Sequence, residues 1–307
     1  APSSDAPAVW HDVHVRVEGL IAHDLELELV ERWNREHERA APASPGDQAL
    51  AILAESDPDR SARALARNPH AMQMQRTVSV GTEIADIRRD DIWRGYVQLI
   101  GCATQLLFLE TAGFQEPRLA DAIVRQAETQ PGLVVILVAQ TENQTANQTG
   151  IDALVSATPH GASGPHAGPA MQRELFTRLA ASIPRARLGL YTMSGRRVCS
   201  NLLLVDDRAL SIGSASATPR GFFLDTELNL VLEAPSVVRD LRHRLWAHDL
   251  ALAVTTVAGW RPADFVAQWD AVARDNAGRE PDQQLGEAVV PFDAARAGAA
   301  RASGLSG

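Results

Sequence analysis

Lysine is absent from this sequence of 307 residues, and all 29 of its basic residues are arginine. No ε-ammonium group is therefore available as a Schiff base, as a buried general base or as a compact charge for phosphate. This absence excludes lysine-dependent covalent catalysis and phosphate loops of the Walker type, which need a lysine.

Cysteine and long apolar runs are also scarce. Cys102 and Cys199 are the two cysteines, too few for a disulfide framework or an all-cysteine zinc cage. The apolar helix pattern around Cys102 predicts that this side chain lies in the core. The apolar stretch 132–139 is far shorter than the roughly 20 residues of a membrane span. We therefore expect a soluble protein, and the sequence leaves open whether it is cytoplasmic or a secreted mature form.

The composition is that of a globular protein, with 45% hydrophobic and 22% charged residues. It is rich in arginine and alanine, as in many bacterial proteins. The net charge of −9 argues against a broad nucleic-acid surface, but one arginine-lined pocket for a phosphate group stays compatible with it.

Predicted helices and strands alternate from about residue 88. This order favours an α/β fold with a mixed, mostly parallel sheet flanked by helices. The predicted helices span 90–103, 117–129, 170–182, 235–250 and 262–274. The predicted strands span 105–110, 133–139, 187–192, 198–205, 209–212 and 226–233. Before them, the alternating pattern of 10–19 predicts a strand and the spacing of 21–33 predicts a helix.

A weak internal repeat relates the segments 12–33 and 225–246. Each has a strand that opens on aspartate, then a turn and a helix that ends in tryptophan. The matched residues are Asp12, His14 and Trp33 in the first segment and Asp225, Glu227 and Trp246 in the second. The repeat predicts a protein built from two related lobes.

The segment 198–229, VCSNLLLVDDRALSIGSASATPRGFFLDTELN, carries the most specific pattern. It resembles the second motif of the phospholipase D superfamily: His-x-Lys, four residues, Asp, six residues, Gly-Ser-x-Asn, then a strand with Asp-Thr-Glu-x-Asn. Cys199 stands where the family has histidine, Asn201 where it has lysine, and Ser216 where it has asparagine. The residues that match the family pattern are Asp206, Gly213, Ser214, Asp225, Thr226, Glu227 and Asn229.

The resemblance extends to the segments 10–19, 91–96 and 237–250, which are similar to a strand, a helix start and the closing helix of the same family. It implies one complete phospholipase D-like αβα lobe and the end of another. Under it, 1–38 is the last strand and helix of a first lobe, 39–87 a linker or surface excursion, 88–260 the second lobe, and 261–307 a C-terminal helix and tail. The family's first motif would lie before Trp10, where nine residues remain.

The resemblance also implies a chemistry that this chain only partly retains. In the family, one histidine attacks phosphorus, a second protonates the leaving oxygen, and lysine and asparagine hold the phosphoryl oxygens. Here Cys199, Asn201, Asp206 and Glu227 occupy the catalytic motif positions without the histidine or the lysine. Removing several members of such a unit leaves only residual catalysis.

We therefore expect a phospholipase D-like protein with a degenerate phosphodiesterase site and little or no hydrolysis by this chain alone. Gly213, Ser214 and Ser216 are its predicted phosphate-binding residues, and a phosphate-containing small molecule or phospholipid head group is the expected ligand. Two alternatives stay open. The chain could be a fragment or subunit of an active phosphodiesterase, completed by a missing lobe, a second chain or a homodimer, or it could be a non-catalytic interaction module.

Several polar residues have two interpretations. Cys199 could be a thiolate nucleophile or a small side chain that fills the space of histidine. Asp206 and Asp207 fit a tight hairpin better than acid–base chemistry. A buried Glu227 would need a donor such as Asn201 or an arginine.

The histidines do not predict a metal site. His11, Asp12 and His14 cannot converge from one strand, because neighbouring residues point to opposite faces. His14 is instead a candidate for the lobe interface, and His160 and His166 fit a surface loop. The sequence implies no cofactor and no metal.

Overall fold

The structure is a computed structural model, and it describes residues 9–39, 70–78, 89–140 and 167–292. A sheet of nine strands forms the centre, in the order β11-β6-β5-β4-β8-β9-β10-β2-β3, and β1 pairs separately with β7. The strands are β1 (Val9–His11), β2 (Ala71–Val78), β3 (Arg89–Asp90), β4 (Leu106–Thr111), β5 (Val134–Ala139), β6 (Leu188–Met193), β7 (Arg196–Val198), β8 (Leu202–Val205), β9 (Ala209–Gly213), β10 (Glu227–Glu233) and β11 (Val289–Pro291).

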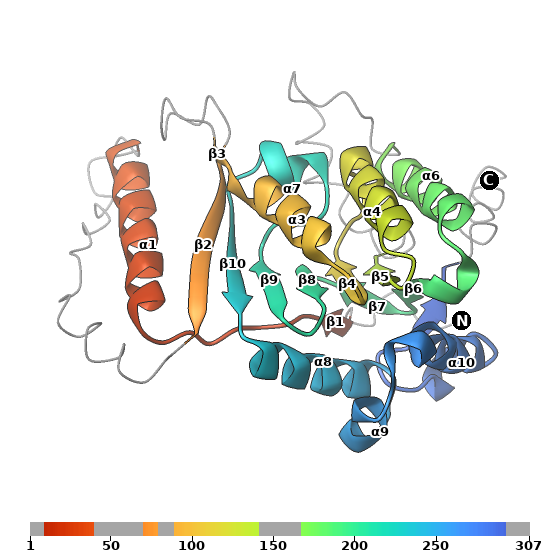
Figure 1. The fold of residues 1–307 in the computed structure, drawn as a ribbon. Helices are drawn as coiled ribbons and strands as arrows, with labels where there is room; N and C mark the ends of the chain where they lie inside the picture. Colours follow the sequence, from red (N-terminus) through yellow and green to blue (C-terminus); the bar gives the residue numbers. More distant parts are fainter. Residues whose placement is uncertain (1–8, 40–69, 79–88, 141–166, 293–307) are drawn as a thin grey trace, which may run out of the picture.

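Helices cover both faces of this sheet (Figure 1). They are α1 (Leu20–Arg39), α3 (Asp91–Cys102), α4 (Pro117–Thr129), α6 (Ala167–Ser182), α7 (Pro219–Phe223), α8 (Pro235–Asp249), α9 (Val254–Ala258) and α10 (Phe265–Ala277), with short 3-10 turns at Arg185–Arg187, Pro262–Asp264 and Pro281–Gln283. Helices α3, α4 and α6 lie on one face, and α8 and α10 lie on the other. The predicted α/β fold with a mixed sheet flanked by helices is confirmed.

The expected predominance of parallel strands is wrong. Within the described main sheet, only β4–β5 and β5–β6 are parallel pairs. Strands β8, β9 and β10 run antiparallel to their neighbours in the sheet. Of these pairs, β8 and β9 are joined by a short hairpin turn. The turn between β8 and β9 places Asp206 and Asp207 at φ 53°, a left-handed geometry that aspartate tolerates better than most residues and that suits a tight hairpin.

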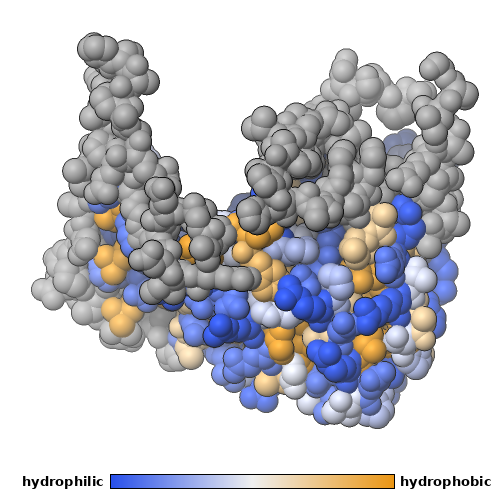
Figure 2. All heavy atoms as spheres, turned by 90° about the horizontal axis from the view of Figure 1, so that it is seen from above, coloured by the Kyte–Doolittle hydropathy of each residue, from blue (hydrophilic) through white to orange (hydrophobic). Residues whose placement is uncertain are grey.

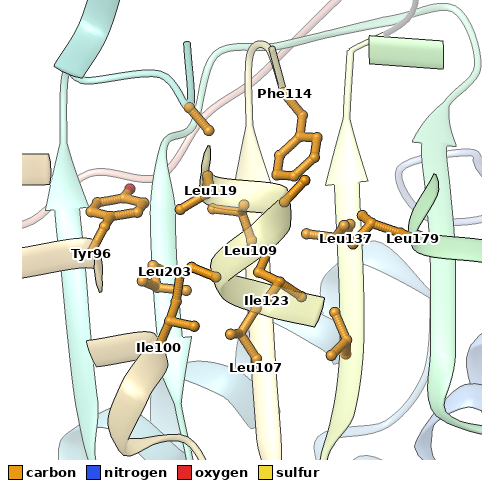
Figure 3. Close-up of a cluster of buried hydrophobic side chains, with 14 of the residues drawn as sticks. Tyr96, Ile100, Leu107, Leu109, Phe114, Leu119, Ile123, Leu137, Leu179 and Leu203 are labelled. Carbon is orange, nitrogen blue, oxygen red and sulfur yellow. The ribbon is translucent and has the colours of Figure 1, made fainter. Parts of the chain in front are cut away.

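Successive side chains of the central strands point alternately to the two faces of the sheet. Leu107 and Leu109 of β4 and Leu203 of β8 point toward α3 and α4, whereas Phe108 and Leu204 point toward α8 and α10. Figure 3 shows the first cluster, in which side chains of β4, β5 and β8 meet those of α3 and α4. Both faces of the central strands are therefore buried, as expected of a sheet between two helical layers.

Helix α4 shows why the sequence folds locally as it does. The side chain of Glu116 accepts a hydrogen bond of 3.0 Å from the backbone N–H of Arg118, and Pro117 occupies the first helical turn, where its missing N–H has no cost. Leu119 and Ile123 then face the core at a spacing of four residues. The helix begins and ends where the sequence predicted.

One strand of the main sheet comes from the segment 39–87, which was predicted as a linker or surface excursion. Residues 71–78 of this segment form β2, which pairs with β10 inside the main sheet. Helix α1 lies beside β2 (Figure 1), where Glu28 forms an ion pair with Arg76. The strand predicted over 10–19 is limited to β1, because residues 12–18 have no strand partner in the described structure.

The face of the molecule seen from above in Figure 2 has mostly hydrophilic described residues, with hydrophobic residues scattered among them. Such a surface is expected from the composition of a globular protein. Cys102, predicted as a core residue, is exposed at the end of α3. Among the helices that the structure describes, none combines the length and the apolar character that crossing a bilayer requires.

Candidate functional site

Four of the predicted motif residues, Asn201, Gly213, Ser214 and Glu227, lie together where neighbouring strands of the main sheet begin or end, a region that we call the Ser214 edge. Asn201 precedes β8, Gly213 ends β9, Ser214 follows it, and Glu227 begins β10. The same edge holds the end of β4, because β8 runs antiparallel to β4 and pairs Leu202 with Glu110. The sequence spacing therefore brings Asn201, Ser214 and Glu227 to the ends of neighbouring strands.

Asn201 is buried, and its carboxamide is fully hydrogen bonded. Its Oδ1 atom accepts from the Thr111 hydroxyl at 3.0 Å and from the Ala112 N–H at 3.1 Å. Its Nδ2 atom donates to the carbonyl oxygens of Cys199 at 3.2 Å and Ser214 at 3.3 Å. An amide offers two donor hydrogens and one acceptor oxygen, so this side chain has little capacity left for a ligand. It holds three segments of the site edge together.

Cys199 lies between β7 and β8 and is partly buried. Its backbone N–H donates to the His11 carbonyl at 2.8 Å, which continues the pairing of β7 with β1. Burial raises the pKa of the Cys199 thiol, nearby Asp12 raises it further, and Arg197 only partly offsets both. The thiolate is the nucleophilic form of cysteine, so this environment disfavours nucleophilic attack at neutral pH.

Gly213 permits a close approach between β9 and β10. A Cβ atom at this position would lie 2.2 Å from the Leu228 carbonyl oxygen and 2.4 Å from Asn229 Oδ1. Asn229 is buried beside it, donates to the Ser211 hydroxyl at 3.2 Å and accepts from the Ala215 N–H at 3.2 Å. The glycine at this motif position is therefore explained by packing.

Ser214 is exposed, and its hydroxyl donates to the Glu227 carboxylate. Burial raises the pKa of Glu227, the Ser214 hydrogen bond opposes this shift, and Asp225 adds to it. The positive charges of Arg32 and Arg220, at the rim of the site, lower the pKa of Glu227. The sequence indicated that a buried Glu227 would need a donor, with Asn201 or an arginine as examples. The structure gives Ser214 as the donor, whereas the Asn201 carboxamide is bonded elsewhere.

The turn after β9 uses most of its backbone N–H groups internally. Those of Ser214, Ala215, Ala217 and Thr218 donate to acceptors within the chain. The Ser216 hydroxyl lies 3.3 Å from the Thr218 hydroxyl. An anion at this turn would therefore meet side-chain hydroxyls and the rim arginines rather than a backbone nest.

Asp206 lies apart from this edge. It follows β8, whereas Asn201 precedes it, so the length of the strand, about 13 Å at 3.3 Å per residue, separates the two. Its carboxylate accepts hydrogen bonds of 2.7–2.8 Å from Thr104, Gln105 and Leu106. Asp206 is thus placed to close the hairpin onto the start of β4, and not to touch a ligand at the Ser214 edge.

His14 is also outside the cluster. Its side chain is 87% exposed, and its Nε2 atom lies 3.7 Å from Asp12 Oδ2. It lines a groove of about 690 Å³ between the segment 13–21 and α8. His160 and His166 lie outside the described residues.

A second polar cluster was not predicted from the sequence. His11, Glu110, Asp249 and Glu287 are buried together near the end of β4. Ser200 belongs to it, since its hydroxyl donates to Glu110. These residues come from distant parts of the chain, and no spacing rule connects them. The available signals were a predicted buried strand that ends in Glu110 and the presence of His11 in the predicted strand at 10–19.

Comparisons with known proteins find similar solved structures at low identity. No family model matches the chain, and no curated protein matches it. The similar solved structures include Nuc from Salmonella typhimurium, a phospholipase D family member, at 13% identity and a TM-score of 0.38, covering 57% of this chain and 91% of that one. NucT from Helicobacter pylori is similar at 12% identity and a TM-score of 0.35, covering 57% and 93%. Phosphatidylserine synthase from Haemophilus influenzae is similar at 16% identity and a TM-score of 0.39, covering 66% and 41%.

Proposed function

We propose that this chain is a phospholipase D-like protein that binds a phosphate-containing ligand and does not itself hydrolyse phosphodiesters. The observation that carries the proposal is the hydrogen bonding of the Asn201 side chain. At the motif position where the family has a phosphate-holding lysine, this chain has a neutral amide whose donors and acceptor are bonded to the chain itself.

The nucleophile position supports the same conclusion. Cys199 replaces histidine, and its thiol pKa is raised by burial. A cysteine without a lowered pKa attacks phosphorus poorly at neutral pH. Without a competent nucleophile at position 199 and a cation at position 201, this half of the site lacks two of the groups that the family uses to attack phosphorus and to stabilise the phosphoryl oxygens.

Ligand binding is proposed from the polar side chains at the Ser214 edge. The exposed Ser214 and the half-buried Ser216 offer hydroxyls. Arg220 lies nearby, with its side chain 47% exposed and paired with Asp225. Arginine suits phosphate because its planar fork can donate two hydrogen bonds. A phosphate monoester or a phospholipid head group is the ligand that this set favours.

Phosphate binding can be tested by the melting temperature of the full chain. Millimolar inorganic phosphate should raise the Tm more than sulfate does at equal concentration, since both anions stabilise proteins non-specifically. Ser216→Ala and Arg220→Gln should remove the difference between the anions, and Arg261→Gln, which changes an exposed arginine on another surface, should keep it. Equal shifts with both anions in the wild type would leave a non-catalytic interaction module as the better account.

One observation favours a second candidate, a half-site that another lobe completes. Trp10 and Val9 are 58% and 49% exposed on β1, next to the Cys199 backbone, and Arg197 stacks on Trp10 at 4.8 Å. A separately expressed lobe with an intact His-x-Lys motif, or a second copy of the chain, could cover this surface. Phosphodiester turnover on mixing would support this candidate, and a chain that stays monomeric and inactive in such mixtures would exclude it.

A further inference from the structure

The second polar cluster lies on the opposite face of the sheet from the Ser214 edge. Glu110 and Ser200 point toward the α8 and α10 layer, whereas Thr111 and Asn201, one residue further along, are bonded to each other on the other face. Four separate elements supply the cluster: β1 gives His11, β4 gives Glu110, the end of α8 gives Asp249, and the segment before β11 gives Glu287.

The backbone holds these elements at fixed positions. The Glu287 N–H donates to the Asp249 carbonyl at 3.0 Å. Gly286, at φ +61°, lets the two segments approach, because a Cβ atom there would lie 2.3 Å from that carbonyl oxygen. The arrangement is therefore built into the fold and does not depend on mobile surface side chains.

His11 is the centre of the cluster. Its Nε2 atom lies 2.8 Å from Glu110 Oε1 and 3.9 Å from Asp249 Oδ1, and its Nδ1 atom lies 3.4 Å from Glu287 Oε2. The His11 and Asp249 side chains are 4% and 0% exposed, and that of Glu110 is 0% exposed. All three are thus removed from water.

Several carboxylate oxygens in this buried space have no hydrogen bond. Glu110 Oε2 and both oxygens of Asp249 lack a hydrogen-bond partner among the described residues. His248 approaches Asp249, but its Nδ1 atom is 3.7 Å from Oδ1, which is too long for a hydrogen bond. Buried polar atoms are normally paired, so these oxygens point to a missing partner.

The charges of the cluster indicate what that partner is. Glu110, Asp249 and Glu287 supply three carboxylates, and Arg196, 3.3 Å from Glu287, together with His11 supplies two positive charges at most. The remaining cation candidate, His248, has a side chain that is 65% exposed. Isolated carboxylates are costly to bury unless they are paired, protonated or bound to a metal.

We propose that His11, Glu110 and Asp249 bind one divalent first-row transition-metal ion, with Zn²⁺ as the principal candidate. Ligand atoms about 2.1 Å from a tetrahedral zinc ion lie roughly 3.4 Å from one another. The distances of 2.8 and 3.9 Å around His11 Nε2 lie on either side of that value. An imidazole with carboxylates suits zinc or manganese better than magnesium, which prefers oxygen ligands alone. His248 and Glu287, with their 3.6 Å approach, would form the outer rim of this centre.

The proposal is tested by calorimetric titration of the metal-stripped full chain with ZnCl₂, MnCl₂ and MgCl₂. The expected result is saturable binding of one Zn²⁺ per chain, tighter than Mg²⁺, together with a higher Tm. Asp249→Asn and Glu110→Gln should weaken Zn²⁺ binding at least about 100-fold, the upper range for loss of an outer partner alone. Asp264→Asn, a matched change in an exposed carboxylate, should leave the affinity unchanged.

A measurement on the wild type covers the case in which the buried variants do not fold. Zn²⁺ should shift the ¹⁵N resonance of the His11 Nε2 atom in step with the calorimetric isotherm, because this atom is the proposed ligand. Zinc that binds without perturbing His11, no saturable binding at all, or a folded Asp249→Asn variant with wild-type affinity would each overturn the proposal. None of these outcomes bears on phosphate binding at the Ser214 edge, which lies on the other face of the sheet.

Discussion

The Thr111 hydroxyl donates a hydrogen bond of 3.0 Å to Asn201 Oδ1, joining the end of β4 to the start of β8. A lysine at position 201 could not accept this bond, since an ammonium group has no acceptor. The amide of Asn201 is therefore part of a local hydrogen-bond network, and the Ser214 edge is organised around it.

This network gives a stability prediction. Asn201→Ala should lower the free energy of unfolding by about 2–4 kcal/mol, because it leaves the half-buried Ala112 N–H and two carbonyl oxygens without their partner. Urea denaturation measures the change. Ser216→Ala, which removes only a 3.3 Å hydroxyl contact, should cost less than about 1 kcal/mol. An Asn201→Ala variant within about 0.5 kcal/mol of wild type would contradict the structural role of Asn201.

Asp206 gives a second stability prediction. Its carboxylate accepts four hydrogen bonds from residues 104–106, at a backbone φ of 53°. Asp206→Ala should therefore cost about 2–4 kcal/mol, through lost bonds and through backbone strain. Asp206→Gly separates the two causes, because glycine adopts this φ freely. If the glycine variant is as stable as wild type in urea, the carboxylate bonds contribute nothing.

The two cysteines should differ in reactivity. Cys102 is exposed, whereas burial raises the pKa of Cys199 above its ordinary value. At pH 8, iodoacetamide should therefore alkylate Cys102 well before Cys199, because the thiolate is the reacting form. Mass spectrometry of tryptic peptides reports both rates, and Cys102→Ser isolates that of Cys199. Faster labelling of Cys199 than of Cys102 would contradict the raised pKa and support the interpretation of Cys199 as a thiolate nucleophile.

Glu227 gives a pH prediction. Burial raises its pKa in the folded state, so the folded chain retains a proton that the unfolded chain loses. The contribution of Glu227 to stability is then complete below its ordinary pKa near 4.5 and declines as the pH rises through the raised value. In Glu227→Gln this decline should be absent, so the variant gains stability relative to wild type between pH 4.5 and neutrality.

The comparison is made by urea denaturation of both proteins at several pH values. The difference in slope is at most about 1.4 kcal/mol per pH unit for a single proton, and less here because Glu227 is only half-buried. Parallel pH profiles for the two proteins would contradict a raised pKa for Glu227.

Much of the fold was predictable because the local signals agree. The helix over 117–129 has a capping carboxylate, a proline in its first turn and core residues four apart, and it forms as predicted. The hairpin at Asp206 was also predictable from residues that tolerate left-handed backbone. Within α3, Ile92, Tyr96 and Ile100 are buried at a spacing of four, and Cys102 lies about 200° around the helix from Ile100. Its exposure could therefore have been derived from the same periodicity.

Other features depend on contacts that no local pattern contains. The alternation of methionine and glutamine in 71–78 was too weak to predict β2, which is stabilised by pairing along its length with β10. The donor to Glu227 depends on the register that sets Ser214 beside Leu228. The cluster around His11 joins residues up to 276 positions apart, 287 minus 11, and follows only from the tertiary fold.

The most direct test of the account is the hydrolysis of bis(p-nitrophenyl) phosphate by the purified full chain. We predict release of p-nitrophenol at the uncatalysed rate, with no change in Cys199→Ala or Glu227→Gln, because Cys199 is a poor nucleophile and Asn201 is a neutral amide bonded within the chain. Turnover well above background that Cys199→Ala abolishes would contradict the account and identify this chain as an active phosphodiesterase.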